Sequence, residues 1–172
     1  MPGTKGSAME PQAIIDSFRR NVTEHYFDMQ GRVRRQEFWY FILACVVVFI
    51  VAAILDAVIR SGLIVAVVRL ALLLPMAGLG ARRLQDTGRN GSLVWIWVIL
   101  AAINAVIALL LSLSGPLGAL GFLWFFFSIG WLLSLAELVI AIVLIYFWAQ
   151  PGTAGPNQYG PDPKGGFAAA AA

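Results

Sequence analysis

Hydrophobic residues in this chain fall into long uninterrupted runs, and the polar residues collect in short segments between these runs. The runs cover residues 38–59, 63–80, 93–113 and 117–148. A helix needs roughly 20 apolar residues to cross a hydrocarbon core of about 30 Å. Each run is therefore long enough to form a membrane-spanning helix.

Short turn-forming sequences separate the runs. Ser61-Gly62 joins the first two so closely that they should form a helical hairpin, and Ser114-Gly115-Pro116 ends the third. The last run is about 10 residues longer than one span needs. We interpret residues 117–127 as an interfacial or re-entrant lead-in to a span at 128–148. One long tilted helix is the alternative.

The polar N-terminal segment, residues 1–30, has a different pattern. Its apolar residues recur at spacings of three or four, which predicts a short amphipathic helix. These residues are Ile14, Ile15, Phe18, Val22 and Tyr26. The helix either lies on the membrane surface or packs against the protein's own loop on the same side. Because about 37 mostly polar residues precede the first run, a cleavable signal peptide is not predicted.

Basic residues near the ends of the runs predict the orientation, because lysine and arginine are retained on the cytoplasmic side during insertion. They occur before the first run, between the second and third, and after the fourth. These residues are Arg32, Arg34, Arg35, Arg82, Arg83, Arg89 and Lys164. The opposite loops carry only Arg60. Both termini are therefore expected in the cytoplasm.

The amino-acid composition also indicates a membrane protein. Hydrophobic residues make up 60% of the chain and charged residues 12%, a balance far from that of a soluble domain. We predict an all-α integral membrane protein, a bundle of four transmembrane helices whose necessary partner is the lipid bilayer. Its parts are the N-terminal segment, a membrane domain at 31–150 and a Gly/Pro-rich cytoplasmic tail at 151–172. The single cysteine, Cys45, lies in the first run and excludes an intramolecular disulfide.

Three polar motifs lie on the predicted cytoplasmic side, at residues 31–39, 82–92 and 157–163. The first reads Gly-Arg-x-x-Arg-x-Glu-Phe-Trp, the second Arg-Arg-Leu-Gln-Asp-x-Gly-Arg-Asn-Gly-Ser, and the third Asn-x-Tyr-Gly-Pro-x-Pro. In this order, with helices between them, they resemble a family of bacterial inner-membrane proteins, domain of unknown function 805. The resemblance covers most of the chain. It implies a multi-pass inner-membrane protein without an established activity.

The chain departs from the family's usual pattern at three positions. Gln85 replaces a histidine, Asn90 a serine and Ser92 a tryptophan. A mechanism that uses the family histidine as a proton carrier or metal ligand would lack its side chain here. The lone histidine, His25, lies in the N-terminal segment, and a metal role is not predicted for it.

The central motif places several charges beside the membrane. If residues 82–86 continue the second helix, Thr87-Gly88 supplies its stop, and Arg82 and Asp86 are one helical turn apart and can pair. This leaves Arg83 and Arg89 for Glu37 or a lipid phosphate. Each arginine near an anionic leaflet gains roughly 1 kcal/mol. The alternative is that these charges only enforce topology and tie the helix ends together. Candidates for binding a partner or a lipid headgroup are Arg32, Arg35, Glu37, Arg82, Arg83, Asp86, Arg89 and Tyr159.

Three ionisable residues, Asp56, Arg69 and Glu137, lie inside the predicted spans. Each costs about 2.5 to 3.5 kcal/mol at the centre of a helix, so each requires a physical account. Asp56 and Arg69 lie roughly 8 and 10 Å from the hairpin turn at 1.5 Å per residue. Similar depths predict an ion pair across the hairpin, with Arg60 as a competing partner for Asp56.

Glu137 has no basic residue at an obviously similar depth. Three accounts remain open at this point: the carboxyl is protonated, it bonds to Ser134 or Asn104, or it lines a polar path in an oligomer. The last account would make the chain a small transporter or channel.

Enzyme signatures are missing from the sequence. There is no Gly-rich phosphate loop, no Cys/His metal spacing and no nucleophile elbow, so we expect no catalytic activity, cofactor or metal. Nucleic acid is not expected as a partner, because the isoelectric point of about 9.4 arises from few charges on loops.

The leading hypothesis is a non-enzymatic module of the bacterial inner membrane whose cytoplasmic Arg/Gly/Pro face binds a protein or anionic phospholipid. The alternative is a small homo-oligomeric transporter or channel that uses the three intramembrane charges.

Overall fold

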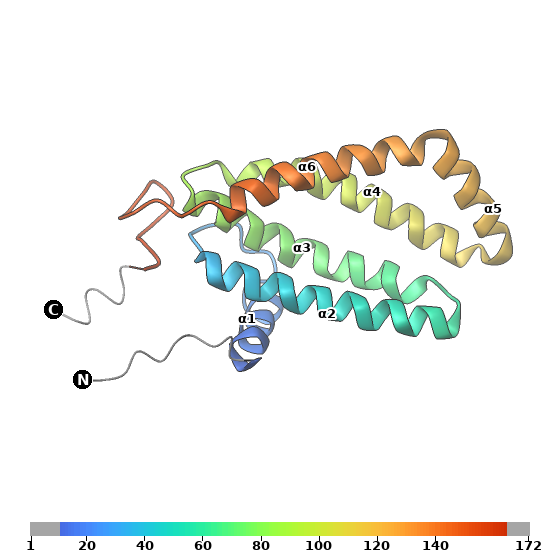
Figure 1. Cartoon of the computed structure of the whole chain (residues 1–172), viewed down its shortest axis with the longest axis horizontal. Helices are drawn as coiled ribbons and strands as arrows, with labels where there is room; N and C mark the ends of the chain where they lie inside the picture. Colours follow the sequence, from blue (N-terminus) through green and yellow to red (C-terminus); the bar gives the residue numbers. More distant parts are fainter. Residues whose placement is uncertain (1–10, 165–172) are drawn as a thin grey trace.

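The computed structural model describes residues 11–164, apart from the side chains of Pro116, Ala119 and Phe122. The described residues form helices and connecting segments, without a named strand (Figure 1). The elements are α1 (Pro11–Thr23), α2 (Arg35–Ile59), α3 (Leu63–Asp86), η1 (Gly91–Leu93), α4 (Val94–Leu113), α5 (Gly115–Phe125), η2 (Phe126–Gly130) and α6 (Trp131–Ala149). Four candidate spans occur among them, at Arg35–Ile59, Leu63–Asp86, Gly91–Leu113 and Leu123–Ala149. The predicted all-α architecture with four spans is confirmed.

The four long helices run side by side in two pairs (Figure 1). α2 and α3 form the predicted hairpin, and α4 and α6 lie together above it in the view. α3 contacts α2 on one side and α4 on the other, which makes it the central helix. The start of α1, the end of α3 and the C-terminal segment all lie at one end of the bundle. Which side of the membrane this end faces stays a prediction from the charge pattern.

The long apolar stretch after residue 116 does not form one straight helix. α5 folds across the end of the bundle that lies away from the termini, where it packs on α4 (Figure 1). The π-helical turn η2 then redirects the chain into α6. Gly130 closes this turn, since a Cβ there would lie 2.6 Å from Cε1 of Phe125. The separate lead-in fits α5, although the candidate span begins earlier than predicted, at Leu123.

Small residues let α3 approach its neighbours closely near its C-terminal end. A Cβ on Gly78 would lie 2.8 Å from the backbone oxygen of Asp28, and one on Gly80 would lie 2.8 Å from Cζ2 of Trp148. The Trp148 indole donates a hydrogen bond of 3.0 Å to the Gly80 carbonyl. The helix continues past the predicted span end at residue 80 to Asp86, directly before the expected stop at Thr87-Gly88, and residues 81–86 are buried.

Pro75 lies inside α3 and leaves one carbonyl of that helix without its usual donor. Proline has no N–H, so the carbonyl of Ala71, four residues earlier, loses its intrahelical hydrogen bond. The hydroxyl of Tyr26 donates to this carbonyl at 2.8 Å. The connection between α1 and α2 therefore satisfies the acceptor that the proline exposes.

α1 packs against the protein itself. Its buried residues are Ser17 and Asn21, and the Phe18 ring stacks on Phe41 of α2 with centroids 5.7 Å apart. Ser17 Oγ donates to the Glu37 carbonyl at 3.1 Å. The helix thus packs on α2 and α3.

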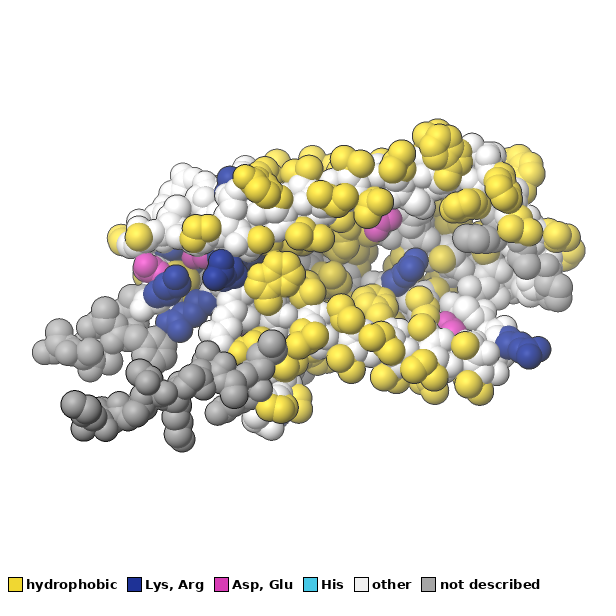
Figure 2. Space-filling view, viewed as in Figure 1, with side chains coloured by type: hydrophobic (Ala, Val, Ile, Leu, Met, Phe, Trp, Pro, Cys, Tyr) yellow, Lys and Arg dark blue, Asp and Glu magenta, His cyan; other side chains and the backbone are white. Residues whose placement is uncertain are grey.

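Most of the apolar surface faces outward, as expected for helices surrounded by lipid. Hydrophobic side chains cover much of the face of the bundle that Figure 2 shows, and large apolar residues are exposed along α2, α4 and α6. The buried apolar cluster is concentrated towards the end that carries the polar motifs, and it includes Cys45. Most of the charged site residues predicted from the motifs lie at this end, where residues 77–86 of α3 are continuously buried.

Candidate functional site

Three charged residues form a buried cluster at the end of α3, which we call the Arg–Asp cluster: Arg32, Arg83 and Asp86. The Asp86 carboxylate accepts from Arg32 Nε at 3.0 Å through Oδ1, and from Arg83 Nη1 through Oδ2. The three side chains are 2%, 0% and 5% exposed, respectively. Two guanidinium groups thus share one carboxylate out of contact with solvent.

Arg83 joins α3 to the end of α6. Its Nε donates to the Trp148 carbonyl at 2.9 Å, and its Nη2 donates to the Gln150 carbonyl. The last carbonyls of a helix have no partners within that helix, and the helix dipole favours a cation there. Arg83 therefore acts as a side-chain cap for α6.

Arg32 holds the C-terminal segment, residues 150–164. Its Nη1 donates to the Gly155 carbonyl at 2.7 Å, and its Nη2 donates to the Thr153 carbonyl at 2.6 Å. The backbone carbonyl of Asp86 accepts from the Thr153 N–H at 2.8 Å. A Cβ on Gly152 would collide with the Asp86 carboxylate, so this position accepts only glycine without a shift. The segment is fixed although it forms no helix.

A second set of polar contacts joins α1 to α3 and α2. Arg82 Nη2 donates to Asn21 Oδ1 at 2.7 Å, and Arg20 pairs with Glu37. The predicted pair between Arg82 and Asp86 is therefore wrong. Arg83, one residue further along the helix, takes that carboxylate instead. The predicted use of Glu37 as the partner of Arg83 or Arg89 is also wrong, because α1 folds back and supplies Arg20.

Sequence reasoning missed Arg20 and Asn21, of which Asn21 is buried and Arg20 is exposed. The only available signal was the position of Asn21 on the inner face of an amphipathic helix. Within the described residues, two buried polar atoms of α3 have no hydrogen-bond partner, Arg82 Nε and Gln85 Oε1. The Gln85 side-chain nitrogen donates to the Met29 carbonyl at 2.8 Å.

The remaining predicted residues lie closer to the surface. Arg35 is exposed and its Nη1 lies 3.4 Å from the Ala149 carbonyl. Arg89 is half-buried, with its guanidinium carbon 4.3 Å from the centre of the Phe147 ring. Tyr159 is half-buried in the C-terminal segment, and its backbone N–H donates to Asn157 at 2.9 Å. These three side chains stay available for the predicted contacts.

Asp162 closes a loop within the C-terminal segment. Its carboxylate accepts from the backbone N–H of Lys164 at 2.9 Å and of Gly155 at 3.0 Å. The Lys164 bond and then the Gly155 bond lower the pKa of Asp162 below its usual value, since both stabilise the charged form. The positive charge of Arg32 acts in the same direction.

Asp56 does not form the predicted ion pair with Arg69. Its carboxylate accepts instead from the backbone N–H groups of Ile64 at 3.1 Å and Val65 at 2.7 Å, and from Ser61 Oγ at 2.7 Å. These are the first free donors of α3, so Asp56 caps that helix from the preceding one. The prediction was wrong because depth alone does not account for the unpaired N–H groups at a helix start.

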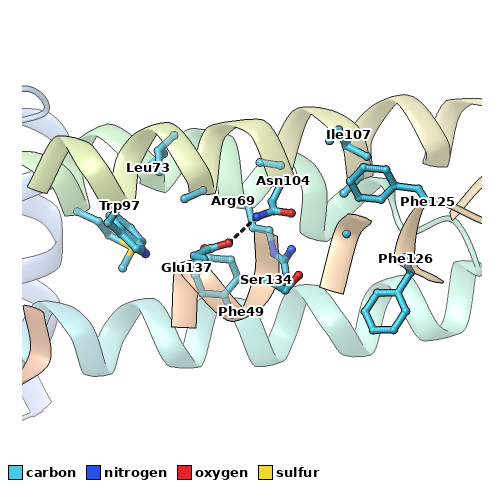
Figure 3. Close-up of a pocket in the computed structure, with 15 residues that line it drawn as sticks. Phe49, Arg69, Leu73, Trp97, Asn104, Ile107, Phe125, Phe126, Ser134 and Glu137 are labelled. Atoms are coloured by element: carbon cyan, nitrogen blue, oxygen red, sulfur yellow. Dashed lines mark hydrogen bonds between the residues drawn. The ribbon is translucent and has the colours of Figure 1, made fainter. Parts of the chain in front are cut away.

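Arg69 and Glu137 line one intramembrane pocket, which has a volume of about 420 Å³ (Figure 3). Glu137 accepts from Asn104 Nδ2 at 2.7 Å, so bonding to Asn104 is the correct choice between the two predicted partners. The expectation that no basic residue lies near Glu137 was wrong. Within residues 11–164, however, no ion pair joins Arg69 to Glu137, and no hydrogen bond to Arg69 is found.

The donor set for a metal ion is sparse in the described part of the chain. No group of three His, Cys, Asp or Glu side chains there could hold a metal. The polar side chains of the intramembrane pocket suit hydrogen bonding, and the Arg–Asp cluster has little room beside its own contacts.

Comparison with known proteins identifies relatives over most of the chain. A family model described as "Protein of unknown function (DUF805)" matches residues 26–161. Inner membrane protein YhaH of Escherichia coli (strain K12) is 30% identical over 149 residues, which are 83% of this chain and 93% of the relative. Inner membrane protein YhaI of the same strain is 30% identical over 148 residues, or 85% and 94% of the two chains. No solved structure matches the chain significantly.

Proposed function

The chain belongs to the DUF805 family of inner-membrane proteins, and from the fixed polar segment at one end of its bundle we propose that it is a non-enzymatic module that binds a protein partner or anionic lipid. The binding face is the end that carries the C-terminal segment and α1, which we expect in the cytoplasm because of its basic residues. The Arg–Asp cluster is the scaffold of this face and does not itself contact the partner.

The observation that supports the proposal is the fixed C-terminal segment. Residues 150–164 are held by Arg32, by the Asp86 carbonyl and by Asn157, whose side chain donates to the Gln85 carbonyl at 2.9 Å. Membrane topology requires positive charge at this end, but it does not require an ordered tail. Fixing the segment orders its outward side chains before binding, which reduces the entropy lost on association. These exposed residues are Pro151, Thr153, Ala154, Pro156, Gln158, Pro161 and Lys164.

Two exposed arginines, Arg20 of α1 and Arg35 of α2, lie at the same end of the bundle as the fixed segment. Arg35 lies at the start of α2 beside the end of α6, and the Arg20 side chain is 47% exposed next to Glu37. A guanidinium binds a phosphate or a carboxylate with two parallel hydrogen bonds. The face can therefore recognise an anionic headgroup or an acidic protein segment without any change in the buried cluster.

The test is cross-linking in native membranes followed by mass spectrometry. The surface variant carries Arg35→Ser, Gln158→Ala and Lys164→Ser, and the matched control carries Arg60→Ser at the other end of the bundle. We expect one protein or anionic phospholipid to be captured by the wild type and the control but lost from the surface variant. Equal capture by all three proteins would contradict a binding role for this face.

A second candidate function is the small oligomeric transporter or channel. One observation favours it: Arg69 and Glu137 line the same intramembrane pocket. Asp56 no longer belongs to this path as a charge partner, because it caps α3. Under this candidate Glu137→Gln should abolish flux, whereas the surface variant should leave flux unchanged.

A further inference from the structure

The intramembrane pocket has the mixed lining of a small-molecule site. Aromatic and aliphatic side chains from several helices form most of its wall, and polar groups of α3, α4 and α6 converge in it (Figure 3). The polar side chains are Arg69, Asn104, Ser134 and Glu137. A volume of about 420 Å³ lies within the range of known ligand pockets, which is roughly 300 to 1,000 Å³.

The pocket is open towards the lipid side of the bundle. Figure 2 shows a basic and an acidic side chain between two rows of hydrophobic ones. Arg69 is exposed and Glu137 is half-buried. The π-helical turn η2 forms part of the wall through Phe126 and Gly130. Such turns are frequent at functional sites because they re-aim neighbouring side chains. A molecule dissolved in the bilayer can reach the polar groups from this side.

The charges of the pocket select the kind of ligand. Arg69 offers unoccupied donors, whereas the Glu137 carboxylate offers acceptor sites beyond its bond to Asn104. An anionic group beside Arg69 would also lie near the Glu137 carboxylate, and a cationic group beside Glu137 would lie near Arg69. A neutral group that both accepts and donates hydrogen bonds satisfies the two residues together. It also supplies the partner that a charged side chain in a membrane span requires.

We propose that this pocket binds a neutral amphiphile whose polar group accepts a hydrogen bond from Arg69 and donates one to Glu137. The apolar body of the ligand packs on the aromatic wall formed by Phe49, Trp97 and Phe125. A long-chain alcohol, amide or glycerol ester has this chemistry. The site is independent of the binding face at the end of the bundle, and it requires no transport.

The experiment uses the full-length protein in phosphatidylcholine vesicles. The probe is 1-oleoylglycerol with a photoreactive diazirine near the start of its acyl chain, and labelled peptides are located by mass spectrometry. We expect labelling within residues 97–108 or 125–137. Unlabelled 1-oleoylglycerol should suppress it about tenfold, whereas methyl oleate, which lacks a donor, should not.

Two variants test the role of the pocket in different ways. Arg69→Leu removes the donor, and Ala101→Phe fills the pocket while leaving its charges in place. Both should lower the labelling about tenfold, whereas the control Arg60→Leu should not. Thermal unfolding of each variant confirms that it is folded. Because the two variants act separately, misfolding of one leaves the other as a test.

Three results would overturn the proposal. The first is equal labelling of wild type, Arg69→Leu and Ala101→Phe. The second is competition by methyl oleate or by oleate as strong as that by 1-oleoylglycerol. The third is rapid reaction of Ser134→Cys, in a Cys45→Ala background, with a water-soluble thiol reagent in the presence of saturating 1-oleoylglycerol. That last result would indicate a water-filled path.

Discussion

Arg83 and Arg69 lie on the same helix, α3, but they differ in burial, in ion pairing and in hydrogen bonding. Arg83 is fully buried, pairs with Asp86 and donates to two carbonyls at the end of α6. Arg69 is exposed in the intramembrane pocket, and no hydrogen bond to it is found in the described part of the chain. The same residue type thus occurs once with its hydrogen bonds satisfied by the protein and once with its donors open.

The difference between the two arginines distinguishes a structural role from a binding role. Removing one member of a buried, fully bonded charge cluster leaves the other charges without partners, so such clusters resist change. An unpaired charge in a span lowers stability and is retained where a ligand or partner completes it. We therefore assign the Arg–Asp cluster to the fold, and the open donors of Arg69 support the proposal that the intramembrane pocket binds a ligand.

The largest expected effect comes from Asp86→Ala. This change leaves the guanidinium groups of Arg32 and Arg83 buried without their shared carboxylate. The free energy of unfolding should fall by about 3 to 5 kcal/mol. Chemical unfolding in detergent micelles measures it, with Glu137→Ala as the matched loss of a carboxylate from the pocket. If Asp86→Ala loses no more unfolding free energy than the control, the structural role of the Arg–Asp cluster is contradicted.

Gly152→Ala should have the next largest effect. The new methyl group meets the Asp86 carboxylate, so residues 150–164 must shift or detach. We expect a loss of about 1 to 3 kcal/mol in unfolding free energy. Limited proteolysis should cleave the tail sooner than in the wild type. The control Ala154→Ser, at an exposed position of the same segment, should behave as the wild type. An unchanged tail in Gly152→Ala would show that the cluster does not hold it.

Tyr26→Phe tests a single hydrogen bond at the proline in α3. Loss of the hydroxyl leaves the Ala71 carbonyl without a donor and should cost about 0.5 to 1.5 kcal/mol. The same change in a Pro75→Ala background should cost nearly nothing, because residue 75 then supplies the N–H. Unfolding of the four proteins in a double-mutant cycle measures the coupling. An equal loss of unfolding free energy in both backgrounds would contradict the idea that the Tyr26 hydroxyl replaces the N–H that Pro75 lacks.

The smallest expected effect is the acid titration of Asp162. A lowered pKa means that the charged carboxylate stabilises the folded tail, so this contribution is complete above the ordinary value of about 3.9. It is lost as the pH falls through the lowered value. NMR shifts of the Gly155 and Lys164 amides should titrate with a midpoint below the ordinary pKa, and they should not titrate in Asp162→Asn. A midpoint at or above the ordinary value would contradict the two hydrogen bonds.

The number and type of membrane helices could be predicted from the sequence, because length and continuous apolarity decide them. The runs at 38–59 and 93–113 correspond closely to α2 and α4. The apolar run ends at residue 80, so the end of α3 at Asp86 follows instead from the Thr87-Gly88 stop signal. The burial of residues 81–86 could not be predicted, because it depends on contacts with α1, the α1–α2 connection and the C-terminal segment.

The partners of the charged residues were the least predictable part of the site. Arg82 and Arg83 are adjacent, and which of them faces Asp86 depends on a rotation of the helix that other elements fix. Asp56 and Arg69 lie at similar depths, but the Asp56 carboxylate accepts from the free N–H groups of Ile64 and Val65 and forms no ion pair with Arg69. The meeting of Arg69 with Glu137 depends on how the two helix pairs pack, and no short sequence pattern encodes that.

The most direct test of the account compares Arg83→Leu with Arg69→Leu in the same detergent. Each variant replaces an arginine of α3 by the same apolar residue, so helix propensity and the loss of charge are matched. We predict that Arg83→Leu lowers the unfolding free energy by about 3 to 5 kcal/mol, whereas Arg69→Leu leaves it unchanged or raises it. A loss for Arg69→Leu as large as that for Arg83→Leu would contradict the division between a structural cluster and a binding pocket.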